Sequence, residues 1–303
     1  AFWGNGSETP IASESGGGAV GFNSDYLDNG GDATDLGDGP AVGPQVSYLI
    51  SPVIDCSGES EVWLSFYSSY RVFQSSTYIS VSSDGGMSYD TTFFINGLDV
   101  PGESAVLTLD AIQQRIALDI SAVAANQDDV VVRFEWGDAA SPEFSGYYYY
   151  WMIDDVALTT RPTNELDLIT FFHPSANGYT PSCLLNYDTF GFFADVINRG
   201  TADQTNVTAV VNVLQSVTGP DQVIHTDTIN FGTLAPDDTA SFDFNTFVPE
   251  GFAEGDYYVQ YLTFSDSADF ATFNNRNYFH QGEFIVDNSR LSKSLDPRGI
   301  TSG

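Results

Sequence analysis

The sequence predicts an all-β protein made of two β-sandwich domains, and three observations support this class. Apolar and polar residues alternate with a period of two through most of the chain, whereas helical periodicity is nearly absent. The alternating runs are short, and Gly, Asp and Asn residues separate them in the way that turns separate strands. The length of 303 residues corresponds to two domains of about 150 residues each.

The first domain is expected to span residues 1–160. Residues 1–45 are rich in Gly, Asp and Ser and form a loop-rich segment with little strand signal. Residues 78–82 (YISVS) alternate and run into Asp84-Gly85-Gly86, which predicts a β-hairpin at this point.

Two further elements of the first domain follow from the pattern. Residues 119–126 (DISAVAAN) predict a short helical turn that connects two strands. In residues 130–136 (VVVRFEW), alternate side chains belong to opposite faces of one strand. The apolar face consists of Val130, Val132, Phe134 and Trp136.

The boundary between the domains is expected at residues 159–164 (TTRPTN), where Pro162 interrupts strand pairing. The second domain, residues 161–287, contains about seven candidate strands, the number typical of an immunoglobulin-like sandwich. One of them, at residues 206–216, places apolar side chains on one face: Val207, Ala209, Val211 and Val213. Residues 288–303 lose the alternation and are expected to form a linker or an extended tail.

The charge of the chain excludes several classes of partner. Lys and Arg total 9 against 41 Asp and Glu, which gives a formal net charge of -32. Nucleic-acid binding needs a basic surface, and attachment to anionic lipid needs a polybasic segment. No run of 18 apolar residues is present, so no membrane insertion is expected.

The acidic residues are mostly Asp, with 30 Asp against 11 Glu. Asp is a calcium ligand, and it also favours turns. A third explanation is adaptation to salt, since surface acidity maintains solubility. The composition alone leaves all three explanations open.

No catalytic motif is found, and we expect no enzymatic activity in this chain. Its three histidines, His173, His225 and His280, lie in no recognised motif. A pair of carboxylates as in glycosidases has no signature in sequence spacing, so membership in a larger enzyme stays open. The only cysteines, Cys56 and Cys183, either form an interdomain disulfide or stay free.

Several motifs of the first domain occur in a characteristic order. YLISPVIDCSG at residues 48–58 is followed by EVWLSFYSSYR, TYISVSSDGG and ALDISAVAANQDDVVVRFEW, and the series closes with YYYWMIDDVALTT. In this order residues 20–160 resemble the MAM-like and cleaved-adhesin jelly-roll family of secreted Bacteroidetes surface proteins. The resemblance implies a jelly-roll sandwich, an extracellular adhesion or glycan-binding role, and a structural calcium bound by Asp25 and Asp155, with Asp154 beside it.

The second domain resembles CARDB-type immunoglobulin-like modules. The motifs that carry this resemblance are FFADVINRGTADQTNVTAVVNV, INFGTLAPDDTASFDF and GDYYVQYLTF. In this interpretation the second domain serves as a spacer.

The residues themselves also indicate calcium. Asp25 and Asp28 belong to a Gly-rich loop whose backbone can turn sharply and offer carbonyl oxygens, although its spacing is not that of an EF-hand. Asp154 and Asp155 are adjacent in an apolar strand, so one carboxylate should point inward. A buried carboxylate needs a cation or hydrogen-bond donors. Backbone hydrogen bonding and solvated turns are the alternatives to calcium at these two places.

Aromatic residues supply a candidate ligand-binding surface. Residues 147–151 (YYYYW) cannot all face one core, so some rings should face outward, where they can stack on sugar rings or on another protein. Arg71 and Arg133 are rare cations that can anchor a carboxylate on an acidic sugar or on a neighbouring strand. The candidate ligand-binding residues are Tyr67, Tyr70, Tyr149 and Trp151; strand propensity and packing are the alternative explanation.

The leading hypothesis is a non-catalytic, secreted or cell-surface adhesion segment with calcium-stabilised loops. Its partner would be a glycan or an extracellular protein. Two alternatives are kept: a structural building block of a surface filament or layer, whose partners are copies of itself, and accessory domains of a secreted peptidase or glycosidase.

Overall fold

The structure is a computed structural model. It describes residues 15–23, 46–73, 76–95, 112–137, 148–172, 178–185, 187, 189–217, 220–272, 274–276, 284–288 and 294–295. The chain divides into two compact units, Ala1–Arg161 and Pro162–Gly303. Strands dominate both units, which confirms the predicted all-β class.

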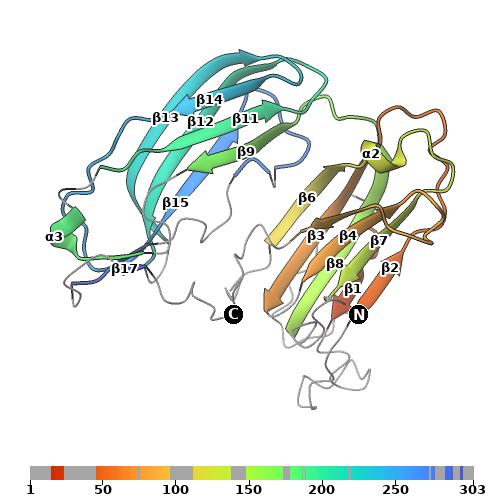
Figure 1. Cartoon of the computed structure of the whole chain (residues 1–303), viewed down its shortest axis with the longest axis horizontal. Helices are drawn as coiled ribbons and strands as arrows, with labels where there is room; N and C mark the ends of the chain where they lie inside the picture. The colour runs from red at the N-terminus through yellow and green to blue at the C-terminus, as the bar shows by residue number, and fades with distance from the viewer. Residues whose placement is uncertain are drawn as a thin grey trace. The chain divides into compact units, whose positions relative to one another are not determined.

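The described part of unit 1 contains two antiparallel sheets of four strands each. The first sheet has the order β1 (Val20–Asn23), β8 (Tyr148–Thr159), β3 (Trp63–Phe73) and β6 (Ile112–Asp119). The second has the order β2 (Ser47–Ile50), β7 (Val131–Trp136), β4 (Thr77–Ser82) and β5 (Thr91–Phe94). In Figure 1 these strands lie side by side, with the short helix α2 (Ser121–Ala124) at one end of them.

The core of unit 1 lies between the two sheets. The apolar face predicted for β7 is buried, with Val130 at 0% and Phe134 at 2% exposure. The ring of Phe134 meets Phe66 of β3 edge-on at 5.2 Å and Trp151 of β8 at 5.9 Å between ring centroids. These contacts join the two sheets into a sandwich, as alternation on both inner faces predicts.

Both connecting elements predicted for unit 1 are confirmed. β4 and β5 pair antiparallel as a hairpin, and Gly85 and Gly86 have φ angles of 72° and 86°, which only glycine adopts readily. Helix α2 falls inside residues 119–126. Its first residue, Ser121, donates its backbone N–H to Asp119 Oδ1 at 2.9 Å, and this bond starts the turn.

Unit 2 is also built of two sheets in its described part. The larger has the order β13 (Gln222–Leu234), β12 (Gln204–Gln215), β15 (Gly255–Phe264), β16 (Phe284–Val286), β10 (Gly178–Thr180) and β17 (Ser294–Leu295). The smaller has the order β14 (Thr239–Asp243), β11 (Phe193–Asn198) and β9 (Leu166–Phe172). A short helix, α3 (Ser182–Leu185), follows β10. All described pairs are antiparallel except β10 with β16.

The core of unit 2 confirms the alternation predicted for β12. Its four apolar residues on one face, from Val207 to Val213, are at most 1% exposed. Aromatic rings close one end of the core, where Phe252, Tyr257 and Phe284 stack at centroid distances of 4.7 and 5.3 Å. Burial of such large rings is the main source of stability in a sandwich of this size.

Two boundaries differ from the sequence prediction. β1 lies inside the loop-rich segment 1–45 and pairs with β8, and β17 lies inside the tail 288–303 and pairs with β10. Both strands are short, at 4 and 2 residues, too short for alternation to stand out.

Both cysteines are free thiols; Cys56 is buried and Cys183 is exposed. In the part of the chain that the structure describes, no helix is long and apolar enough to cross a membrane.

Candidate functional site

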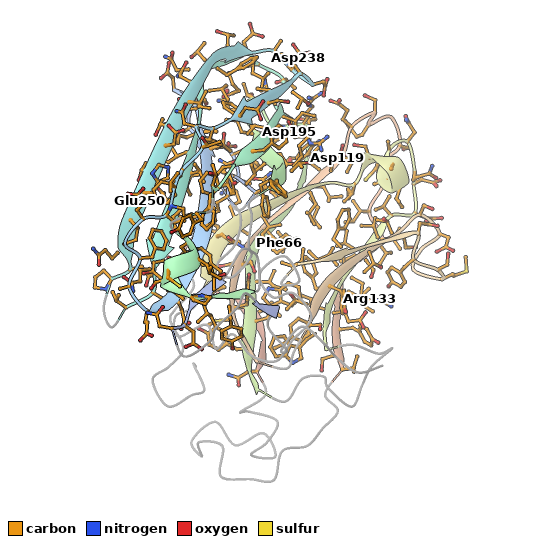
Figure 2. All side chains as sticks on the ribbon, turned by 60° about the vertical axis from the view of Figure 1, so that its left-hand side comes forward. Phe66, Asp119, Arg133, Asp195, Asp238 and Glu250 are labelled. Atoms are coloured by element: carbon orange, nitrogen blue, oxygen red, sulfur yellow. The ribbon has the colours of Figure 1, made fainter. Side chains whose placement is uncertain are left out.

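The outer face of the sheet β2–β7–β4–β5 carries an arginine held between two tyrosines. We call Tyr48, Tyr89 and Arg133 the tyrosine–arginine platform. Strand alternation in β7 turns Phe134 inward and Arg133 outward. Figure 2 shows Arg133 at a distance from the core residue Phe66. The Cζ atom of Arg133 lies 3.8 Å from the ring centroid of Tyr89 and 4.9 Å from that of Tyr48. Both distances are within the range of a cation–π contact, and two such contacts restrain the guanidinium group.

Hydrogen bonds hold Arg133 further. Its Nη2 atom donates to Glu135 Oε2 at 3.2 Å and approaches Ser80 Oγ at 3.5 Å. Arg133 was expected to anchor a ligand or a neighbouring strand, but its charge is matched within its own strand. Glu135, on the face of β7 opposite the predicted apolar set, is only 7% exposed, and Arg133, two residues away on the same face, pairs with its carboxylate.

The surroundings of the platform combine apolar and polar surface. Tyr48 and Ile50 of β2 are 46% and 54% exposed. Ile50 is the register partner of Arg133, which in turn pairs with Ser80 of β4. The Ser80 hydroxyl bonds Thr92 Oγ1 at 3.0 Å. A ligand on this face would meet ring surface, hydroxyl groups and an oriented ion pair.

The structure moves two predicted ligand-binding residues into the core. Tyr70 and Trp151 are both 0% exposed, so the prediction that they bind a ligand is wrong. Trp151 packs on Phe22 of β1 at 5.7 Å, and its indole N–H donates to Ser68 Oγ at 2.9 Å. The ring of Trp151 on β8 is therefore a packing element of the core.

The other two predicted aromatics have different outcomes. Tyr67 is partly exposed on β3, and the Cζ atom of Arg115, its register partner on β6, lies 6.0 Å from its ring centroid. Tyr149 belongs to β8, but its side chain lies outside the described residues, so its role stays a prediction. The side chain of Arg71 lies outside them as well.

The two acids predicted to bind calcium lie at a β-bulge in β8. Asp154 pairs with Tyr67 and Ala157 with Ser65, so two residues of β8 oppose one of β3. Asp155 has a φ of 51°, and its N–H donates to Asp154 Oδ1 at 2.8 Å. The bulge interrupts the alternation on which the prediction of one inward carboxylate rested. Both side chains are half-buried instead.

Part of this bulge lacks hydrogen-bond donors. Asp154 Oδ2 is buried and has no hydrogen-bond partner among the described residues. The N–H of Ser15 approaches Asp155 Oδ2 at 3.4 Å, which brings the N-terminal segment to the bulge. Asp25 and Asp28 lie outside the described residues. Within those residues, no group of three or more His, Cys, Asp or Glu could hold a metal ion.

Unit 2 contains titratable groups with perturbed protonation. Burial, and then the neighbouring Asp269 carboxylate, raise the pKa of Glu165 to about 9. His225 stacks on Phe247 at 4.0 Å, and burial lowers its pKa, opposed by Asp227. His225 is thus a packing residue, while His173 and His280 lie outside the described residues.

Sequence reasoning missed Tyr48 and Tyr89. Each is a single tyrosine among residues that predict something else. Tyr48 belongs to the strand YLIS, and Tyr89 follows the glycines of the predicted hairpin. The signal was Arg133, a rare cation in the middle of an apolar strand. The register of β2 with β7 brings Tyr48 near Arg133, and Tyr89 comes from the turn that joins β4 to β5.

Neither a protein-family model nor a curated protein matches the sequence. Among solved structures, the chain is similar to a CARDB domain from Pyrococcus furiosus in complex with di-metal ions. The identity is 14%, the match covers 43% of this chain and 93% of that domain, and the TM-score is 0.29. The C-terminal domain of wzt is similar at 14% identity, over 47% of this chain and 92% of that one, with a TM-score of 0.29.

A calcium binding mutant of Bacteroides uniformis beta-glucuronidase 2 is similar at 11% identity, with a TM-score of 0.32. The match covers 75% of this chain and 25% of that enzyme, so the chain spans about a quarter of its length.

Proposed function

We propose that this chain is a non-catalytic binding segment of an extracellular protein and that the tyrosine–arginine platform binds a glycan. The observation that carries the proposal is the guanidinium of Arg133, which contacts two tyrosine rings on a sheet face where Tyr48 is 46% exposed. Small-molecule sites combine aromatic side chains with a few placed polar groups, and the platform contains both.

The chemistry of the platform suits a sugar. Ring faces stack on the apolar face of a pyranose, while the Arg133–Glu135 pair and the Ser80 hydroxyl offer donors and acceptors to its hydroxyl groups. The net charge of -32 repels polyanions, and Glu135 already balances Arg133. A neutral glycan is therefore the ligand class that fits best.

The proposal includes calcium in unit 1. Asp154 and Asp155 at the β8 bulge would bind the ion together with Asp25 and Asp28, and Asp154 Oδ2 supplies a buried oxygen that lacks a donor among the described residues. Calcium takes six to eight oxygen ligands, so loop carbonyls would complete the set. A secreted or cell-surface location is part of this proposal, since extracellular fluids supply calcium.

The experiment is a screen of the purified chain against neutral polysaccharides and a glycan array, followed by titration calorimetry with the best ligand. Tyr48→Ala should weaken binding about tenfold or more, because truncating a central aromatic contact costs roughly 1.4 kcal/mol or more. Arg133→Met should do the same by removing the oriented ion pair.

The matched control is Tyr187→Ala, which removes a tyrosine that is 87% exposed in unit 2. It should bind as the wild type does. Equal affinity of Tyr48→Ala, Arg133→Met and the control would overturn the proposed site. If the wild-type chain binds no glycan and associates with itself, a structural building block is favoured instead.

A further inference from the structure

Two carboxyl groups of unit 2 meet at the beginning of β9. Glu165 directly precedes β9, and Asp269 belongs to the segment that follows β15. Glu165 is 0% exposed, whereas Asp269 is half-buried. The two side chains lie within hydrogen-bonding distance of each other. We call Glu165 and Asp269 the carboxyl pair.

Each member of the carboxyl pair accepts hydrogen bonds from the element to which the other member belongs. Glu165 accepts the N–H of Ala271 on Oε2 at 2.9 Å and the amide of Asn274 on Oε1 at 3.0 Å. Asp269 Oδ2 accepts the N–H of Leu166 at 3.0 Å. The carboxyl pair therefore attaches the segment after β15 to the first residues of β9.

One oxygen of the carboxyl pair lacks an N–H donor. Asp269 Oδ1 is buried, and no described residue donates a hydrogen bond to it when both carboxyl groups are counted as ionised. A proton on Glu165 supplies the missing donor, because two carboxyl groups in contact share a proton. Burial, and then the charge of Asp269, raise the pKa of Glu165 to about 9, so this proton is present at neutral pH.

Other charged groups belong to the elements around the carboxyl pair. They are Asp167 of β9, Arg199 and Asp203 between β11 and β12, and Asp266 and Arg276 of the segment after β15. Arg199 Nε donates to Asp167 Oδ2 at 3.3 Å, so its charge is directed to that carboxylate. The charge that acts on Glu165 is the one on Asp269. Loss of the proton therefore places a second negative charge beside Asp269.

We propose that the carboxyl pair is a pH-sensitive attachment, in which one shared proton holds the segment after β15 on β9 and loss of that proton loosens the segment. With the proton, Glu165 donates to Asp269 Oδ1. Without it, two negative charges repel each other in a place that water does not screen. Backbone bonds such as Phe270 N–H to Asn164 O at 3.0 Å do not involve the proton, so the loosening is local.

The same proton makes the stability of unit 2 depend on pH. The ordinary pKa of the Glu165 carboxyl is 4.5, and in the folded chain it is about 9. Between these values the folded chain holds a proton that the unfolded chain has released. The stability that the proton contributes is complete below about pH 4.5 and decreases as the pH rises toward 9. One proton of difference changes the unfolding equilibrium about tenfold per pH unit.

The two units can be observed separately in the full chain. All four tryptophans belong to unit 1: Trp3, Trp63, Trp136 and Trp151. Tryptophan fluorescence therefore follows the unfolding of unit 1, whereas scanning calorimetry follows both units. A calorimetric transition without a tryptophan signal belongs to unit 2.

The first experiment compares the unit 2 transition of the wild type and Glu165→Gln at several pH values. The variant cannot titrate at this position, and it should fold because the new amide can donate to Asp269 Oδ1 while Asn274 turns its own amide. Between about pH 6 and 8, the unfolding equilibrium constant of the wild type should rise about tenfold per pH unit relative to the variant. Other groups that titrate, such as His225, are present in both proteins and cancel in this ratio.

Two further measurements observe the proton and the segment directly. Infrared spectra of the wild type at pH 7.5 should contain the C=O band of a protonated carboxyl group, and this band should disappear above about pH 9. It should be missing in Glu165→Gln, and in Asp269→Asn it should disappear at a lower pH, because the neighbouring charge is gone. Brief digestion with subtilisin above pH 9 should cut the wild type in the segment after β15, with the cuts located by mass spectrometry, and should spare Glu165→Gln there.

Glu250→Gln is the matched control, since it makes the same substitution at an exposed position of unit 2 (Figure 2). It should keep the pH dependence, the infrared band and the digestion pattern of the wild type. A constant ratio between the wild type and Glu165→Gln across the pH range overturns the proposal. If Glu165→Gln does not fold, the wild type and Asp269→Asn decide. Absence of the band in the wild type at pH 7.5, its loss at the same pH in both proteins, or no increase in cutting of the segment above pH 9 overturns the proposal.

Discussion

Ser68 and Ser69 are neighbours on β3, both 0% exposed, yet their hydroxyl groups differ in hydrogen bonding. Ser68 Oγ accepts the indole N–H of Trp151 at 2.9 Å. Ser69 Oγ is buried without a hydrogen-bond partner among the described residues. The same substitution by alanine should therefore change the stability of unit 1 in two different ways.

The expected magnitudes follow from these contacts. Ser68→Ala leaves a buried indole donor unsatisfied, which should lower the free energy of unfolding by about 1–3 kcal/mol. Ser69→Ala removes a hydroxyl whose unsatisfied burial is itself unfavourable by about 1–3 kcal/mol. Because some packing contact is lost as well, we expect Ser69→Ala to leave the stability unchanged or to raise it by up to about 1 kcal/mol.

Urea denaturation followed by tryptophan fluorescence measures this difference, because all four tryptophans, Trp3, Trp63, Trp136 and Trp151, belong to unit 1. The denaturant slope m should stay constant, so that the midpoint shift reflects the folded state. In a Trp151→Phe background, where the donor is absent, Ser68→Ala should lower the stability less, with a coupling of about 1 kcal/mol. Equal effects of the two serine substitutions, or a neutral Ser68→Ala, would refute the argument from hydrogen bonding.

Two other predictions concern unit 2. Because unit 2 contains no tryptophan, its unfolding is the calorimetric transition that has no tryptophan signal, and this transition tests both predictions. Burial lowers the pKa of His225 in the folded state. As the pH falls below about 6.5, the unfolded chain therefore takes up a proton before the folded chain does. The stability of unit 2 should fall over this range, until the pH reaches the lowered pKa of the folded state. His225→Phe, which keeps a ring on Phe247, should lose less stability between pH 7.5 and 5.5; an unchanged pH dependence would contradict this. Gly200→Ala would place a Cβ 2.4 Å from Thr163 O and should destabilise by about 1–3 kcal/mol, whereas Gly191→Ala, with no atom within 4 Å, should have little effect.

The strands were predictable because their pattern is local. In β7 and β12, alternation over 6 and 12 residues identifies the buried face without reference to any other part of the chain. The hairpin after β4 was equally local, since two glycines with positive φ close it. The fold class and most strands therefore follow from the sequence.

The contacts that form the candidate sites are not local. The run of five rings at residues 147–151 does not reveal which rings face the core, because every position is aromatic and alternation is lost. Trp151 is buried against Phe22 and donates a hydrogen bond to Ser68, and these two residues come from two other strands. Likewise Glu165 meets Asp269 only after the chain has passed through most of unit 2.

The excess of Asp over Glu has an explanation in turns that requires no metal. In three turns of unit 1, an Asp carboxylate accepts both the backbone N–H and the hydroxyl of a serine two or four residues later: Asp55 with Ser57, Asp84 with Ser88, and Asp119 with Ser121. Asp is short enough to reach back to its own turn. Bonds from Ser88 hold the pKa of Asp84 down to about 2, so this turn should keep its form in acid.

Composition is thus a poor argument for calcium in this chain, and burial is a better one. The carboxylates in these turns accept hydrogen bonds from nearby serine donors. Asp154 Oδ2 is different, since it is buried and no described residue donates to it. A cation can satisfy a buried oxygen that the polypeptide leaves without a donor. The β8 bulge, where calcium is proposed, is therefore distinguished from the acids in these turns by the missing donor.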